Sequence, residues 1–408
     1  MENLHPRCAG LDVHKKMVMA CVRVCAQGKV REEVRSFSTT TRGLLELSDW
    51  LAESGCTIVA MEATGAYWKP IWHVLEGQFE LVLANAAHIR NVPGRKSDVN
   101  DATWIAQLLA HGLIRSSFVP PGPIQELRDL TRTRRQLVRE MVQHKQRVQR
   151  VLEDCNIKLD SVISDILGVS GRAIHDAIVA GESNPKQLAA LGNDRLKCSR
   201  EALEEALLGR ATRHHRFLLA QHLRMIDNLQ STVQQFEAQI EATLQPFRDA
   251  LNLLVTIPGI STTAAQVVLA EIGTDMTQFP SAGHLLSWAG LCPGMHESAG
   301  KHHSTRLRKG APWLKPVLVQ CAWAAARSKE TYLQAQFLRV KSRRGPKKAA
   351  VAVAASILTA AYYMLRDAVA YQDLGPEHFV KRDRARMAQK LTRRLRELGY
   401  DVEIRKAA

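Results

Sequence analysis

Residues 9–24, AGLDVHKKMVMACVRV, decide the fold of the N-terminal region. Apolar and β-branched residues dominate both halves of the stretch, and polar residues 14–16 interrupt them. This pattern predicts two strands joined by a tight turn. A Gln-Gly-Lys turn at 27–29 follows, and VREEVRSFS then predicts a third strand. The chain therefore opens with three meandering strands.

Helices and strands alternate after these three strands. We expect a helix at 42–53, a strand at 57–64, a helix around 66–76, a strand at 79–85 and a helix at 97–111. A three-strand meander followed by this alternation is the order of a ribonuclease-H-like or RuvC-like α/β fold. We assign it to a first domain, residues 1–115.

Four carboxylates occupy selected positions in this layout. Asp12 lies on the first strand, Glu62 lies at the end of the fourth, and Asp98 and Asp101 lie three residues apart on one helix face. Clustered carboxylates repel one another, and hard Mg²⁺ prefers carboxylate oxygens. Together the four predict a pocket for two Mg²⁺ ions about 3.5–4 Å apart. Each acid alone is better explained as a strand-end, turn or solvated first-turn residue, and only the set of four indicates the metal site.

The composition points to a soluble protein with a polyanionic partner. Hydrophobic residues make up 46% of the 408 residues, but the net charge is +16. Such a charge indicates nucleic acid or an anionic membrane surface. No apolar run approaches the roughly 20 residues of a membrane span, and no secretory signal is visible. Eight scattered cysteines without a CxxC pair suit reduced thiols, so we expect a cytoplasmic, nucleoid-associated protein of a prokaryote with no membrane partner.

Two long helices are predicted in the middle of the chain, at 123–155 and 216–244. Their apolar residues follow a near-heptad rhythm. We expect an antiparallel coiled coil over 116–248, with a helical insertion at about 156–212. The arginines of 128–150 either track a phosphate backbone or form a solvated charged face.

The remaining sequence predicts a helical C-terminal domain at 249–330 and a basic helical extension at 331–408. Residues 252–274 resemble a helix-hairpin-helix element, in which Gly259 allows close backbone approach, although a plain helix turn is as good a reading. Residues 292–310, CPGMHESAGKHHSTRLRKG, are predicted to form a polar, basic loop. Its adjacent histidines do not have metal-ligand spacing. The expected nucleic-acid contacts are Lys96, Gly259, Lys301, Arg306, Arg308, Lys309, Arg343 and Arg344.

Several motifs carry a resemblance to a known family. GLDVHKK, AMEATGAYW and GRKSDVNDA resemble the RuvC-like domain of DEDD transposases of bridge-RNA-guided insertion sequences. IPGISTTAAQVVLAEIG and SAGKHHSTRLRKG look like the C-terminal transposase domain of that family. The resemblance covers most of the chain, and the ordered combination is more specific than any one motif.

The resemblance implies an RNA-guided recombinase of an insertion sequence. Asp12, Glu62, Asp98 and Asp101 match the Mg²⁺-binding acids, and Ser298 matches a serine that forms a covalent link to DNA. Ser304 is the alternative nucleophile, because family members commonly have Ser-Gly where this chain has Ser-Ala-Gly. The implied partners are donor and target DNA, a structured guide RNA and further copies of the chain, as a dimer or tetramer.

Two other functions are compatible with the residues. A metal-dependent RuvC-like nuclease would use only the four acids and water. A non-enzymatic RNA-binding protein would account for the positive charge but not for the acids.

Overall fold

A computed structural model describes residues 3–84, 89, 101–293, 296–298, 301–304, 306–307 and 310–403. For 296–298, 301–304 and 381–387 only the backbone is described. The chain divides into two compact units, Met1–Val119 and Pro120–Ala408.

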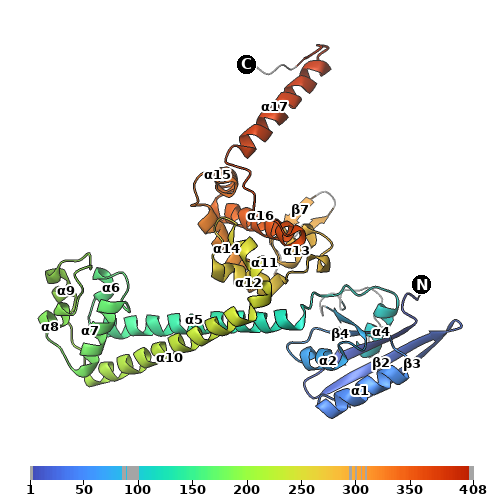
Figure 1. Ribbon diagram of the computed structural model, residues 1–408, viewed down its shortest axis with the longest axis horizontal. Helices are drawn as coiled ribbons and strands as arrows, with labels where there is room; N and C mark the ends of the chain where they lie inside the picture. The colour runs from blue at the N-terminus through green and yellow to red at the C-terminus, as the bar shows by residue number, and fades with distance from the viewer. Residues whose placement is uncertain are drawn as a thin grey trace. The chain divides into compact units, whose positions relative to one another are not determined.

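The first unit contains a five-stranded sheet (Figure 1). Its strands are β1 (Arg7–Val13), β2 (Met17–Ala26), β3 (Lys29–Ser38), β4 (Ile58–Glu62) and β5 (Glu80–Ala84). The spatial order is β3-β2-β1-β4-β5, with β1, β2 and β3 antiparallel and β1, β4 and β5 parallel. The predicted meander and the mixed α/β class are confirmed.

Helices cover both faces of this sheet. On one face Ala9 and Leu11 of β1 share a core with α1 (Thr41–Glu53) and α2 (Trp68–Leu75). On the other face Cys8 shares a core with α4 (Asp101–Ala110). Successive strand residues point to opposite faces, so the apolar run of β1 supplies both cores.

In the second unit two long helices, α5 (Gly122–Asp154) and α10 (Arg213–Thr243), pack along each other. The C-terminal end of α5 shares a core with the N-terminal end of α10, for example Val148 with Leu223, so the pair is antiparallel. Both helices match the predicted ranges, whereas supercoiling of the pair stays a prediction. The helices between them are α6 (Leu159–Val162), α7 (Val169–Ala180), α8 (Pro185–Ala190) and α9 (Arg200–Ala206).

Among the residues that the structure describes, the regular elements in the rest of the second unit are helices and one hairpin. Its elements are η1 (Gln245–Phe247), α11 (Arg248–Val255), α12 (Thr262–Ile272), η2 (Met276–Gln278), α13 (Ala282–Trp288), β6 (His296–Ser298), β7 (Lys301–Ser304), α14 (Leu314–Ala325), α15 (Tyr332–Arg344), α16 (Pro346–Asp367) and α17 (His378–Glu397). The prediction of a loop at residues 292–310 is therefore wrong in part, because β6 and β7 pair within that segment.

One helix in the described part of the chain, α16, is long and apolar enough to cross a membrane by length and composition. Half of its most apolar stretch is buried within the fold, where Val353, Ile357 and Leu358 are inaccessible to solvent. Such burial is that of a core helix, so α16 is weak evidence for a membrane segment.

Candidate functional site

Strands β1 and β4 end side by side, and each carries an acidic residue near its end. Leu11 is paired with Met61 in the parallel register, and one further step along both strands sets Asp12 beside Glu62. Adjacent strands are about 4.8 Å apart, and residues in register on parallel strands point to the same face. That face is the one covered by α4. The two carboxylates therefore share one corner of the sheet.

Gly10 brings α4 onto this corner. A Cβ at Gly10 would lie 2.3 Å from the carbonyl oxygen of Ala102 and 2.4 Å from the amide nitrogen of Ala106, so only glycine allows this approach. Leu4 N–H donates to the carbonyl of Ala110 at 2.8 Å, at the opposite end of α4. The helix thus runs antiparallel to β1, and its first residue, Asp101, lies at the end where Asp12 lies.

His14 contacts this corner and was not predicted as a site residue. Its Nε2 lies 3.0 Å from Oδ2 of Asp12, and its side chain is 58% exposed. The residue follows β1 in the turn to β2. The only signal in the sequence was its place two residues after the acid. The contact lets His14 orient the carboxylate of Asp12.

The residue types at this corner are those that a hard divalent cation prefers, although the described side chains are not gathered into a metal-binding group. Carboxylate oxygens of Asp12, Glu62 and Asp101 come from three elements of one unit, and such oxygens are the ligands that Mg²⁺ prefers. Asp98 and Lys96 lie outside the described residues. Among the residues that the structure does describe, no three His, Cys, Asp or Glu side chains are close enough to hold a metal ion.

The candidate nucleophile lies on the hairpin of the second unit. Ser298 is the last residue of β6 and pairs with Lys301 of β7 across residues 299–300. A bridge between Pro293 and Leu307 closes the base of the hairpin. Gly310 anchors it further, because a Cβ there would lie 2.3 Å from the carbonyl oxygen of Ala289. Backbone pairing thus presents Ser298 at the end of a short strand.

Comparisons with known proteins match both of these regions. Residues 9–157 match the model of the DEDD transposase domain of IS110, described as a transposase. Residues 251–338 match a model described as "Transposase IS116/IS110/IS902 family". Two separate segments of the chain are thus similar to transposase domains of the IS110 family. A DEDD domain implies the use of a divalent metal ion.

A curated relative is similar to part of the chain. The chain is 33% identical over 144 residues to a Streptomyces coelicolor protein titled "Insertion element IS110 uncharacterized 43.6 kDa protein". The alignment covers 34% of this chain and 34% of that protein. The match therefore spans about a third of the relative's length.

In the C-terminal segment that matches the transposase model, Gly259 approaches another part of the fold closely. Its φ is +88°, and a Cβ there would lie 2.4 Å from the carbonyl oxygen of Cys321 and 2.6 Å from the amide nitrogen of Ala325. The glycine thus seats the α11–α12 turn against α14. Contact of Gly259 with nucleic acid stays a prediction.

The cations predicted to contact nucleic acid are only partly described. Arg306, Arg343 and Arg344 are exposed. The side chain of Lys301, and all of Arg308 and Lys309, lie outside the described residues.

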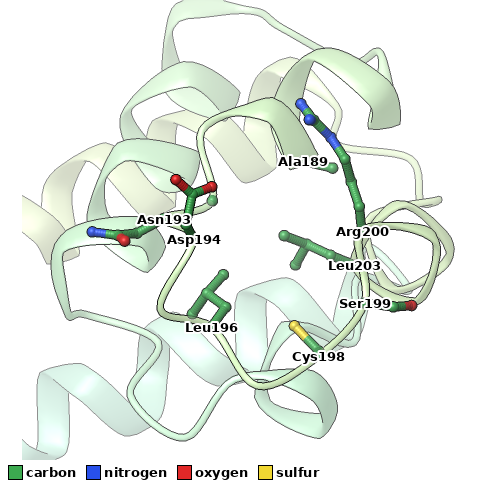
Figure 2. A pocket seen from close by; sticks show the side chains of 9 residues that line it. Ala189, Asn193, Asp194, Leu196, Cys198, Ser199, Arg200 and Leu203 are labelled. Atoms are coloured by element: carbon green, nitrogen blue, oxygen red, sulfur yellow. The ribbon is translucent and has the colours of Figure 1, made fainter.

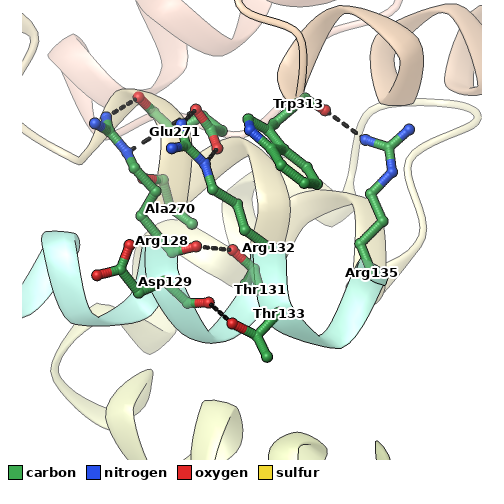
Figure 3. Close-up of polar contacts among 9 residues, drawn as sticks. All are labelled: Arg128, Asp129, Thr131, Arg132, Thr133, Arg135, Ala270, Glu271 and Trp313. Atoms are coloured by element: carbon green, nitrogen blue, oxygen red, sulfur yellow. Dashed lines mark hydrogen bonds and ion pairs between the residues drawn. The ribbon is translucent and has the colours of Figure 1, made fainter. Parts of the chain in front are cut away.

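Arginines at the start of α5 join the two IS110-family segments through a buried carboxylate (Figure 3). Arg132 donates to both carboxylate oxygens of Glu271 on α12, at 2.7 and 2.8 Å, and Glu271 is 1% exposed. Arg128 donates to the backbone carbonyls of Ala270 and Glu271 at 3.1 and 2.7 Å. Burial lowers the pKa of Arg128 to about 10, which leaves it charged at neutral pH.

Trp313, directly before α14, extends this cluster. Arg135 donates to its carbonyl oxygen at 2.8 Å, and the guanidinium groups of Arg132 and Arg139 each lie 5.6 Å from its ring centroid. Over 128–135 the arginines are therefore neither a phosphate track nor a fully solvated face. They fasten α5 to α12 and to the chain that leaves the hairpin.

A separate cavity of about 180 Å³ lies between α8 and α9 (Figure 2). Asp194, Cys198 and Arg200 are among the side chains around it. None of the predicted site residues lines this cavity, and we assign it no role.

Proposed function

We propose that this chain is a DNA transposase that exchanges strands through a serine nucleophile and an acidic, Mg²⁺-binding site. The observation that carries the proposal is the presence of both IS110-family domains in one chain, in order. The neighbouring positions of Asp12 and Glu62 at one corner of the sheet support it independently.

The strand order of the first unit supports a ribonuclease-H-like fold. Three antiparallel strands followed by two parallel ones place the ends of β1 and β4 together. In this proposal Asp12, Glu62, Asp98 and Asp101 hold the metal. Bound there, Mg²⁺ would stabilise negative charge on the phosphate and lower the pKa of an oxygen ligand.

The serine step is a transesterification. Oγ of Ser298 attacks a backbone phosphorus of DNA, a new O–P bond forms, and the bond from phosphorus to one sugar oxygen breaks. The serine proton is lost to a base, and the sugar oxygen leaves as a hydroxyl after gaining a proton. The product is a phosphodiester that links Ser298 to the DNA end, so a hydroxyl of another strand can attack the same phosphorus, break the bond from phosphorus to Oγ of Ser298 and release the serine hydroxyl.

Positive charge supports polyanionic partners for this reaction. With a net charge of +16, the chain suits donor and target DNA together with a structured RNA that selects them. In this proposal the active form contains more than one copy of the chain, as a dimer or tetramer.

Covalent trapping tests the proposal. The wild-type chain is incubated with labelled duplex DNA, its co-purified RNA and Mg²⁺, and the products are separated under denaturing conditions. We expect a protein–DNA adduct in the wild type and in Ser304→Ala, and none in Ser298→Ala. Asp12→Asn should also abolish the adduct, whereas the exposed Asp176→Asn should not.

The other outcomes distinguish the alternatives. An adduct that persists in Ser298→Ala and disappears in Ser304→Ala would show that Ser304, and not Ser298, is the nucleophile. Cleavage without any adduct, still dependent on Asp12, indicates a metal-dependent nuclease that uses water. Binding of RNA without DNA cleavage and without an adduct would indicate a non-enzymatic RNA-binding protein.

A further inference from the structure

The positive charge of the chain is concentrated past its second IS110-family segment. That segment ends at residue 338. Residues 339–408 contain 17 Lys and Arg against 7 Asp and Glu, a net charge of +10 out of +16 for the whole chain. About a sixth of the sequence therefore carries most of the charge, and a polyanionic partner should meet it there.

Five of these cations meet where α15 turns into α16. We call this group the basic elbow, and its members are Lys341, Arg343, Arg344, Lys347 and Lys348. All five side chains are exposed. Within the part of the chain that the structure describes, none of them forms an ion pair or a side-chain hydrogen bond. No Asp or Glu occurs in the sequence between Glu330 and Asp367.

The basic elbow has a rigid base. Gly345 adopts a left-handed φ of +81°, which lets the chain pass directly from one helix to the next. Gln336 Nε2 donates to Oγ of Ser356 at 2.9 Å and ties the two helices together. Ala349 and Ala350, the residues after the last lysine, are buried. The cations are therefore held at fixed spacing rather than on a loose tail.

The stability of the fold does not explain the whole set. Cations in the last turn of α15 are favoured by its dipole, which accounts for Lys341, Arg343 and Arg344. Lys347 and Lys348 lie in the first turn of α16, where the same effect opposes positive charge. Five mutually repelling charges without an acid among them cost stability that an external anion would recover.

We propose that the basic elbow is a docking surface for the phosphate backbone of duplex DNA, outside the catalytic residues. The proposal rests on the transposase function for its choice of DNA. Proteins that bind single strands stack bases on aromatic side chains. No aromatic residue occurs between Phe337, which is buried, and Tyr362, so a surface of cations alone fits the regular phosphates of a duplex.

Salt dependence of binding tests this surface. The affinity of the full-length chain for a 30-base-pair duplex, without Mg²⁺, is measured by fluorescence anisotropy over a series of salt concentrations. The test variant replaces all five basic-elbow residues with Gln. The control replaces five exposed cations of the helical insertion with Gln, namely Lys186, Arg195, Lys197, Arg200 and Arg210. Both variants lose the same net charge.

We expect the test variant to lose about 3 to 4.5 units of slope in the plot of log affinity against log salt, because each phosphate contact contributes about 0.9. The control should lose less than about one unit. Equal losses in both variants would show a general charge effect and overturn the proposal. A loss confined to duplex RNA of the same length would assign the surface to RNA instead and also overturn it.

Failure here is separable from failure of the transposase proposal. An unchanged slope in the test variant, with the Ser298 adduct still formed by the wild type, rejects only the basic elbow. Absence of the adduct, with the slope reduced as expected, rejects only the serine chemistry. Wild-type protein that does not bind duplex DNA rejects both.

Discussion

Two basic segments of the second unit look alike in sequence and differ completely in the structure. At the start of α5, Arg128 and Arg132 are packed against the buried carboxylate of Glu271. At the end of α15, Arg343 and Arg344 are exposed, and no acid lies near them in sequence. The first pair holds the fold together, and the second pair presents its charge to solvent.

The difference shows that the partner of a cation, rather than the density of cations, decides its role. Removing charge from water is costly, and a buried guanidinium persists only where a carboxylate and carbonyl groups satisfy it. Where no such groups exist, the cation stays in water and its charge remains available to a ligand. Substitutions in the two segments, and at one buried histidine, test this contrast.

Loss of the buried carboxylate should have the largest effect. Glu271→Ala removes the buried anion of the partly buried Arg128 and Arg132, so we expect the free energy of unfolding of the second unit to fall by about 3 kcal/mol. Urea unfolding followed by circular dichroism measures the change. The exposed Glu205→Ala should stay within about 0.5 kcal/mol of wild type. A change below about 1 kcal/mol in Glu271→Ala would show that the cluster contributes little.

His175 is a titratable side chain that, unlike Arg132, is buried without a carboxylate partner. His175 on α7 is inaccessible to solvent, and burial is the main cause that lowers its pKa from 6.5 to about 4. In the unfolded chain the ring binds a proton below pH 6.5, while in the folded chain it stays neutral to about pH 4. The stabilising contribution is therefore present above pH 6.5 and is lost as the pH falls towards 4, by about 3 kcal/mol.

The measurement is the free energy of unfolding at pH 7 and at pH 4.5 for matched variants. His175→Leu should remove this part of the acid sensitivity, and the exposed His214→Gln should retain it. An identical acid loss in all three proteins would mean that His175 titrates normally in the folded chain.

Local patterns in the sequence predicted the secondary structure well where periodicity was strong. The helix expected at 123–155 is Gly122–Asp154, and the strand expected at 57–64 is Ile58–Glu62. Apolar spacing fixes such elements with little tertiary help. The β6–β7 hairpin was missed because polar, glycine-containing segments lack that periodicity.

Long-range contacts set the limit of sequence reasoning at the candidate sites. The proximity of Asp12 and Glu62 followed from the expected strand order, since ends of parallel neighbours meet at one edge of a sheet. The role of Arg132 could not be predicted, because Glu271 is 139 residues away and nothing local marks it as its partner. The contact of Gly10 with α4 was likewise invisible without the packed helix.

Substitution of the exposed arginines Arg343 and Arg344 should change the free energy of unfolding least. Arg343→Gln combined with Arg344→Gln removes two charges that no group in the described chain neutralises, so the only stabilisation lost is their interaction with the dipole of α15. That interaction is worth about 0.3–1 kcal/mol for each exposed cation at low salt, and less under screening. We expect the free energy of unfolding to change by less than about 1 kcal/mol at 0.15 M salt, measured by urea unfolding, and to be insensitive to added salt above that. The same double change at Arg128 and Arg132 should cost several times more, because it leaves the Glu271 carboxylate buried without a cation. If the two double variants were equally destabilised, exposure would not separate the two segments, and the contrast between structural and available cations would fail.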